Sequence, residues 1–225
     1  MERPAPAEPP VVGNDVVDLA EAGAPSLRFL GRVLSERERA SLDRGDGVEI
    51  WRLWAAKEAA FKVLARSRPR LVFAHARFVV ELDAGDHGAG ERAGVVRHEE
   101  GCVPVRLREH AGAVECVAGP PHAARACERI ETALRDGGLG DPWGAWAPHQ
   151  LPALPSVAVR RLARRVAALR LGIDAAELEV RRAATVRGGR PGPPELWHRA
   201  RRLERVTLSL SHHGDFVACA VAADA

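Results

Sequence analysis

Apolar and polar residues recur along the chain with periods that predict helices and short strands. From about 49 to 67, Leu53, Ala56, Ala60 and Leu64 fall on one side of a helix. Residues 206–222 alternate around a short polar turn, which predicts a hairpin. The same criteria predict a helix entered at Ser35 within 27–43, helices over 124–136 and 156–173 with Ser156 as N-cap and Gly172 as stop, and strands at 11–19, 77–82, 94–119 and 177–180.

Two parts of the chain resemble each other. PVRLREHAGAVECVAG at 104–119 aligns with TLSLSHHGDFVACAVA at 207–222, which places Cys116 over Cys219 at an offset of 103 residues. The same offset lays Trp54 of one long helix over Val157 of the other. We therefore predict an α+β pseudo-dimer of two similar halves, each a small antiparallel sheet packed on a long helix. The predicted boundaries are a flexible extension over 1–10, a first half over 11–120 and a second half over 121–225.

The two copies differ at polar positions. Each half keeps polar groups that the other lacks, which favours one composite site at the junction of the halves over two independent sites. Under the offset, Glu58, Lys62 and Glu109 align with Arg161, Arg165 and His212.

The composition restricts the class of protein. With 225 residues, of which 46% are hydrophobic and 28% charged, the chain is long enough for one large or two small globular domains. The formal net charge of +3 does not favour wholesale nucleic-acid binding. The arginine-rich helix 156–171 leaves a nucleic-acid module as an alternative, although helices of this kind are more often solvated and no aromatic residues are interleaved for base stacking.

The cysteines and the N-terminus bear on the compartment. The chain has 4 cysteines and none of them forms a CxxC pair, so we expect free thiols and no zinc knuckle. The first residues, MERPAPAEPP, lack a signal-peptide pattern, and no run is apolar for long enough to span a membrane. We expect a soluble cytoplasmic protein with no membrane partner.

Glu58 and Lys62 share one face of the helix at 49–67, because they are four residues apart. On the helix alone, an exposed ion pair worth about 0.3–0.5 kcal/mol is the simpler interpretation. Asp15 interrupts a strand-like run, where a buried carboxylate needs a partner, although GND is also good turn chemistry. A strand carboxylate and a helix carboxylate together could share Mg²⁺, which accepts one or two carboxylates with phosphate oxygens and water.

Two further segments carry candidate binding groups. SLSHHGD ends a strand at His212, where the side chain can reach a ligand or can be an idle turn histidine. A Ser-His-Asp hydrolase is disfavoured because no GxSxG elbow is present. VRGGRPGPP places Arg187 and Arg190 on a loop that could hold a phosphate or be plain basic surface.

Together these segments resemble the 4′-phosphopantetheinyl transferase superfamily. GNDVVDL resembles its G-I-D-I-V-[DE]-I strand, WAAKEAAFK its W/F-x-x-K-E-[AS]-x-x-K helix, and GRP followed by SLSHH its G-K-P loop and Ser-His strand. The motif order is that of the short holo-acyl-carrier-protein synthases, whereas the length and duplication are those of the surfactin-type class. The sequence departs from the family at Asn14, where isoleucine is usual, at Val17, where long enzymes often place a third acid, and at Arg190, where lysine is usual.

The resemblance implies a reaction and roles for the matching residues. It implies transfer of 4′-phosphopantetheine from coenzyme A to a serine of an apo acyl or peptidyl carrier protein. Mg²⁺ would be held by Asp15 and Glu58, with Glu58 or a metal-bound water as the base. Lys62 would assist departure of 3′,5′-ADP, while Lys57, Arg190 and His212 would contact phosphates. A non-catalytic coenzyme A-binding or partner-regulating protein with the same fold is the alternative, and we expect a monomer in either case.

Overall fold

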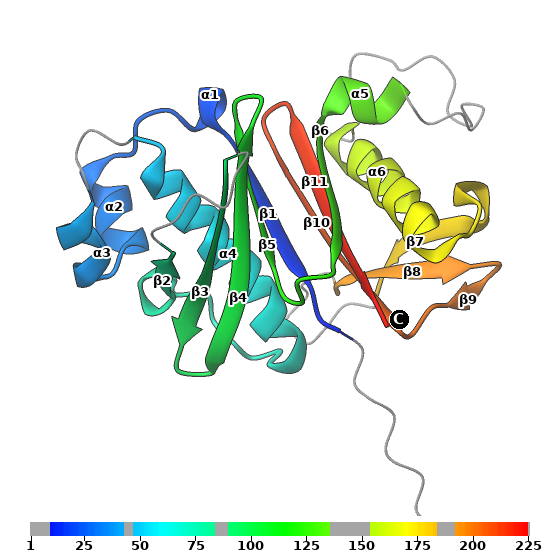
Figure 1. The fold of residues 1–225 in the computed structure, drawn as a ribbon, viewed down its shortest axis with the longest axis horizontal. Coiled ribbons are helices and arrows are strands. Elements are labelled where there is room, and N and C mark those ends of the chain that lie inside the picture. The colour runs from blue at the N-terminus through cyan, green and yellow to red at the C-terminus, as the bar shows by residue number, and fades with distance from the viewer. Residues whose placement is uncertain (1–9, 43–46, 84–89, 136–153, 184–191, 225) are drawn as a thin grey trace, which may run out of the picture.

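Two long helices each pack on one face of an antiparallel sheet, and the two sheets meet along the middle of the molecule (Figure 1). The structure is a computed structural model that describes residues 10–42, 47–83, 90–135, 154–183 and 192–224. Its mixed α+β architecture with antiparallel sheets agrees with the predicted fold class.

The first sheet has five strands in the order β1-β5-β4-β3-β2, and every neighbouring pair is antiparallel. Helix α4 packs across β1, β5 and β4. The elements of this region are β1 (Gly13–Asp18), α1 (Leu19–Ala22), α2 (Leu27–Val33), α3 (Glu36–Ser41), α4 (Glu49–Ser67), η1 (His75–Arg77), β2 (Val79–Leu82), β3 (Glu91–His98), β4 (Gly101–His110) and β5 (Ala113–Ala118).

The second region contains a sheet of order β10-β11-β6, covered by α6, and a separate small sheet of order β7-β8-β9. In Figure 1, α6 lies on the opposite side of the molecule from α4. The elements are β6 (Ala124–Arg129), α5 (Ile130–Arg135), α6 (Leu154–Leu171), η3 (Ala175–Glu177), β7 (Leu178–Arg182), β8 (Pro194–His198), β9 (Arg201–Arg202), β10 (Val206–His213) and β11 (Phe216–Ala223).

The contact between α4 and β1 is unusually close, and it depends on a glycine. Helix α4 buries alanines, including Ala59 and Ala60, against the sheet. A Cβ placed on Gly13 would lie 2.1 Å from the carbonyl oxygen of Ala59, so only glycine fits there. This approach brings the Asp15 side of β1 directly under α4.

The two regions share a strand register. In the first sheet Asp15 of β1 pairs with Cys116 of β5, and in the second Ala126 of β6 pairs with Cys219 of β11. The hairpin β4–β5 and helix α4 therefore have counterparts in β10–β11 and α6 at the predicted offset, and β6 takes the place of β1.

Most predicted elements are present, and two predictions are wrong. The prediction of a helix over 124–136 is wrong, since Ala124–Arg129 forms strand β6 on the edge of β11 and only Ile130–Arg135 is helical. Pairing with an open sheet edge outweighs the helix propensity of this short segment. Ser156 is not an N-cap, because α6 already begins at Leu154. The Ser35 capping box with Glu38 is confirmed.

Small apolar clusters join the two sheets. Val12, just before β1, and Val16 of β1 pack against residues of β11, and Phe216 of β11 is buried against Val16. The cysteines are all free, as predicted, and three of them are at least half-buried. None of the helices in the described ranges is long and apolar enough to cross a membrane.

Candidate functional site

Asp15 and Lys62 form the centre of the candidate site. The Lys62 ammonium on α4 donates to Asp15 Oδ1 at 2.9 Å and to the carbonyl oxygen of Asn14 at 2.7 Å. Only 13% of the Asp15 side chain is exposed. Burial raises the pKa of Asp15 above its usual range, Lys62 opposes the shift, and the charge of Glu58 adds to it. A carboxylate whose pKa is raised by burial is typical of functional sites.

Glu58 lies one helical turn before Lys62 and is close enough to Asp15 for their charges to interact. Its Oε1 lies 3.8 Å from Nε2 of His75, a residue that the sequence did not single out. The His75 ring stacks on Trp54 with centroids 4.5 Å apart. The structure therefore brings Asp15, Glu58 and Lys62 together through the close packing of α4 on β1.

A polar cavity of about 240 Å³ opens beside this group, at the junction of the two regions. Asp15 and Lys62 line it from the first region, and His212 lines it from the second, as the composite-site prediction requires. The rest of its described lining comes from α6, β7 and β10: Ser156, Val159, Arg160, Arg182, Leu210 and Ser211.

His212 lies at the end of β10 with its side chain exposed toward this cavity. Burial of the ring first, and then the cations of Lys62, His213 and Arg182, lower the pKa of His212 below its usual value. The imidazole is therefore neutral at pH 7 when no anion is bound, and a phosphate beside it would favour the protonated form.

Lys57 does not reach the cavity. Its ammonium is fully buried and donates to Glu38 Oε2 at 2.6 Å and to the carbonyl oxygens of Val33 and His75. Burial lowers the pKa of Lys57, and the paired Glu38 opposes that shift. These contacts tie α2, α3 and η1 to α4, so the geometry gives Lys57 a structural position and no path to a phosphate in the cavity.

Arg190 and Arg187 lie outside the described residues. Arg160 and Arg182 take positions on the cavity wall that sequence reasoning missed. Arg160 belongs to the arginine-rich helix predicted over 156–171, but we interpreted the arginines of that helix as a solvated face. Helix periodicity alone could not show which arginine of α6 faces the other region.

Asp15 and Glu58 are the candidate donors for a magnesium ion; Asp15 lines the cavity, whereas Glu58 is not part of its described lining. Burial raises the pKa of Asp15 and the charge of Glu58 adds to the shift, so a divalent cation between the two carboxylates would favour their charged forms. No cluster of three or more His, Cys, Asp or Glu residues with metal-binding geometry occurs among the residues that the structure describes. The protein would therefore supply a carboxylate pair, and water and phosphate oxygens would complete the coordination.

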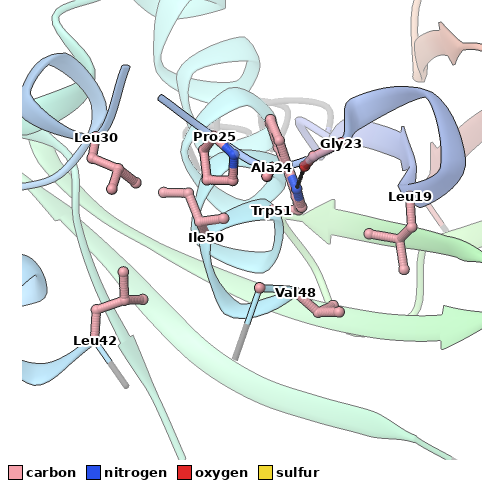
Figure 2. A pocket seen from close by; sticks show the side chains of 10 residues that line it. Leu19, Gly23, Ala24, Pro25, Leu30, Leu42, Val48, Ile50 and Trp51 are labelled. Atoms are coloured by element: carbon pink, nitrogen blue, oxygen red, sulfur yellow. Dashed lines mark hydrogen bonds between the residues drawn. The ribbon is translucent and has the colours of Figure 1, made fainter. Parts of the chain in front are cut away.

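A second hollow, of about 530 Å³, lies between α1, α2 and the start of α4 and is apolar (Figure 2). Trp51 lines this hollow, and its Nε1 donates to the carbonyl oxygen of Gly23. Its described lining carries no charged side chain, so it offers nothing to a phosphate: Leu19, Gly23, Ala24, Pro25, Leu30, Leu42, Gly47, Val48, Ile50 and Trp51.

Residues 11–113 match the family model of the 4′-phosphopantetheinyl transferase superfamily. The match includes Asp15, Glu58 and Lys62, whereas His212 and the arginines of the cavity lie beyond it. The similarity over these residues suggests phosphopantetheine transfer in general. No curated protein matches the chain.

Proposed function

We propose that the protein transfers 4′-phosphopantetheine from coenzyme A to a serine of an apo acyl or peptidyl carrier protein, with Mg²⁺, and releases 3′,5′-ADP. The polar cavity carries this proposal, because it places a buried carboxylate beside a lysine, two arginines and a histidine. A pyrophosphate with a divalent cation needs this combination of charges. The transferase domain match supports the same reaction.

The proposal includes a duplicated architecture. We propose that residues 11–120 and 121–225 are two copies of one unit, preceded by an extension over 1–10. The matched registers of β1 with β5 and of β6 with β11 support duplication. Because both copies already line the cavity, a monomer would hold a complete site. The cytoplasm, where thiols stay reduced, is the proposed compartment.

In the proposed reaction the serine oxygen bonds to the β-phosphorus of coenzyme A. The bond from that phosphorus to the bridging oxygen breaks, 3′,5′-ADP leaves with the electron pair, and Glu58 accepts the serine proton. Asp15 and Glu58 would hold Mg²⁺, which supplies charge stabilisation on the phosphate oxygens when bound. Lys62 would neutralise the leaving group, and Arg160, Arg182, Arg190 and His212 would bind and orient phosphates.

Incubation with Mg²⁺, coenzyme A and a panel of apo carrier proteins, followed by mass spectrometry of the carriers, tests the proposal. We expect one carrier or more to gain a single phosphopantetheine and Glu58→Ala to lose this activity. Arg161→Ala, at the position equivalent to Glu58, is the matched control and should keep it.

Two results would contradict the proposal. Transfer by Glu58→Ala at the wild-type rate would exclude the mechanism. Tight coenzyme A binding without transfer to any fatty-acid, polyketide or peptide carrier would favour the regulatory alternative instead.

A further inference from the structure

Asn14 and Asp18 stand on either side of Asp15 along β1, and both reach across to β10. The backbone N–H of Asn14 donates to Ser209 Oγ at 2.9 Å, and its Nδ2 donates to Ser211 Oγ at 2.8 Å. Asn14, Ser209 and Ser211 are all buried. This polar contact joins residues almost 200 positions apart in the sequence, at a place where the superfamily motif has an apolar residue.

Asp18 makes a second set of contacts at the other end of the same strand. Its carboxylate is 5% exposed, and Oδ1 accepts from the N–H of Ala20 at 3.0 Å, which caps α1. Oδ2 accepts from the N–H of Asp215 at 3.0 Å, and the N–H of Asp18 donates to Nδ1 of His213 at 3.1 Å. Asp18 thus binds both sides of the turn that joins β10 to β11.

The turn itself is shaped around this carboxylate. Gly214 has φ +52°, and a Cβ placed on it would lie 2.4 Å from Oδ2 of Asp18. A side chain at this position is therefore excluded by both the backbone conformation and the carboxylate. Burial alone would raise the pKa of Asp18, but the N–H groups of Asp215, Ala20 and Glu21 lower it, so the carboxylate stays charged and accepts strongly.

We infer that Asn14 and Asp18 form a latch that sets the register of β10 against β1 and so places His212 opposite Asp15. The two strands belong to different sheets, so no backbone ladder fixes their relative position. Ser211 and His213 flank His212, and each is bonded to one member of the latch. Both latch residues are positioning residues, and the inference rests on the proposed function insofar as His212 binds phosphate.

Asp18→Asn separates the capping of α1 by Asp18 from its contact with the turn between β10 and β11. The amide keeps the size of the side chain and an oxygen for the N–H of Ala20, but it turns an NH₂ group toward the N–H of Asp215. The matched control is Asp174→Asn, because Asp174 caps η3 through the N–H of Ala176 at 2.9 Å in the same way but is exposed.

We expect Asp18→Asn to raise the KM for coenzyme A about tenfold, with kcat changed by less than about twofold, because a ground-state phosphate contact is lost. Asp174→Asn should leave both constants unchanged. Asn14→Leu, which removes the other member of the latch, should also raise KM. A KM that stays at the wild-type value in both latch variants would overturn the inference.

A double-mutant cycle distinguishes positioning from general destabilisation. If Asp18 acts through His212, Asp18→Asn combined with His212→Ala should raise KM no further than His212→Ala alone. Effects that multiply would mean that Asp18 does not act through His212, and the inference would fail.

An NMR measurement tests the latch independently of transfer. Because Nδ1 of His213 accepts from Asp18, the neutral ring carries its hydrogen on Nε2, which the ¹⁵N shifts of the ring report. Asp18→Asn keeps the backbone N–H that bonds to His213 but loses the carboxylate contact to the N–H of Asp215, which should displace the turn and the His213 ring. We therefore expect Asp18→Asn to change these shifts and Asp174→Asn to leave them unchanged. If the wild type transfers nothing but the shifts change as expected, only the proposed function fails. If the shifts stay unchanged in Asp18→Asn, the inferred latch is wrong.

Discussion

The strand–helix pairs β1–α4 and β6–α6 correspond by strand register and sequence offset, but they carry different charges at the corresponding positions. Their registers place Ala126 where the first pair has Asp15, and the sequence offset places Arg161 and Arg165 where it has Glu58 and Lys62. In the second pair Arg165 forms an ion pair with Glu128 at 2.9 Å.

This difference separates what the fold needs from what the site needs. The second pair shows that a helix packs on this sheet without a carboxylate at either position. The first pair nevertheless keeps a carboxylate whose pKa burial raises. A group that costs stability and is dispensable for the architecture is best explained by a ligand.

The largest expected effect concerns Lys57 and its counterpart Arg160. Lys57→Met should lower the free energy of unfolding by about 3–5 kcal/mol, because it leaves Glu38 charged and buried without its cation. Arg160→Met should change stability by less than about 1 kcal/mol and weaken coenzyme A binding instead. Chemical denaturation checks the first result and calorimetric titration the second. Equal stability losses in both variants would show that the two positions do not differ as the structure indicates.

The next effect concerns the carboxylates. Glu58→Ala should reduce kcat/KM at least about 100-fold, because both a proton acceptor and a metal ligand are lost. Arg161→Ala should change it by less than about threefold. Mass-spectrometric initial rates with one apo carrier provide the comparison, and a loss in Arg161→Ala as large as in Glu58→Ala would contradict a single composite site.

A smaller effect concerns the first residue of each strand. Gly13→Ala should destabilise the protein by about 1–3 kcal/mol, because the added methyl group meets the carbonyl oxygen of Ala59. The equivalent residue by register is Ala124, and Ala124→Gly should cost only about 0.5–1 kcal/mol, chiefly through chain entropy. Urea unfolding of the two variants measures the difference. If Gly13→Ala leaves the free energy of unfolding unchanged, α4 does not approach β1 as closely as the structure indicates.

The smallest effect is a pH dependence at His212, whose counterpart is Glu109. Burial and nearby cations lower the pKa of His212 in the free protein, and a bound phosphate would raise it. Between those two pKa values coenzyme A binding takes up a proton, so KM should fall severalfold from pH 8 to pH 6. His212→Asn should remove most of this dependence in assays across that range. Glu109 is not part of the described cavity lining, and its carboxylate forms an ion pair with Arg52.

Local pattern predicted much of this fold. The apolar period of α4, the Ser35 capping box and the alternation of β10 and β11 each depend on neighbours within a few residues. The helix predicted over 124–136 is wrong because the conformation of this segment depends on β11, which lies far away in sequence. The predicted start of α6 at Ser156 is also wrong. The Ser156 hydroxyl accepts a hydrogen bond from Arg160 within the first turns of α6 and does not cap the helix.

The candidate site shows the same limit. Asp15, Glu58, Lys62 and His212 were selected through the resemblance of their motifs to a known family. In the structure Asp15, Lys62 and His212 line one cavity, and Glu58 lies close enough to Asp15 for their charges to interact. Lys57 and Lys62 stand on the same helix, and no local feature distinguishes the lysine that is buried from the one that lines the cavity. That distinction arises from α3 and η1, which pack over one side of α4 and leave the other side open toward β1.

The sequence by itself determined which residues can do the chemistry, because the carboxylates, cations and glycines needed are written in short motifs. It also predicted a repeat, since two elements share one offset. Only the tertiary structure decided which charges face one another, which arginines complete the cavity and how β10 is held against β1. Those outcomes depend on contacts between residues such as Asn14 and Ser211, which are 197 positions apart, and no local pattern encodes them.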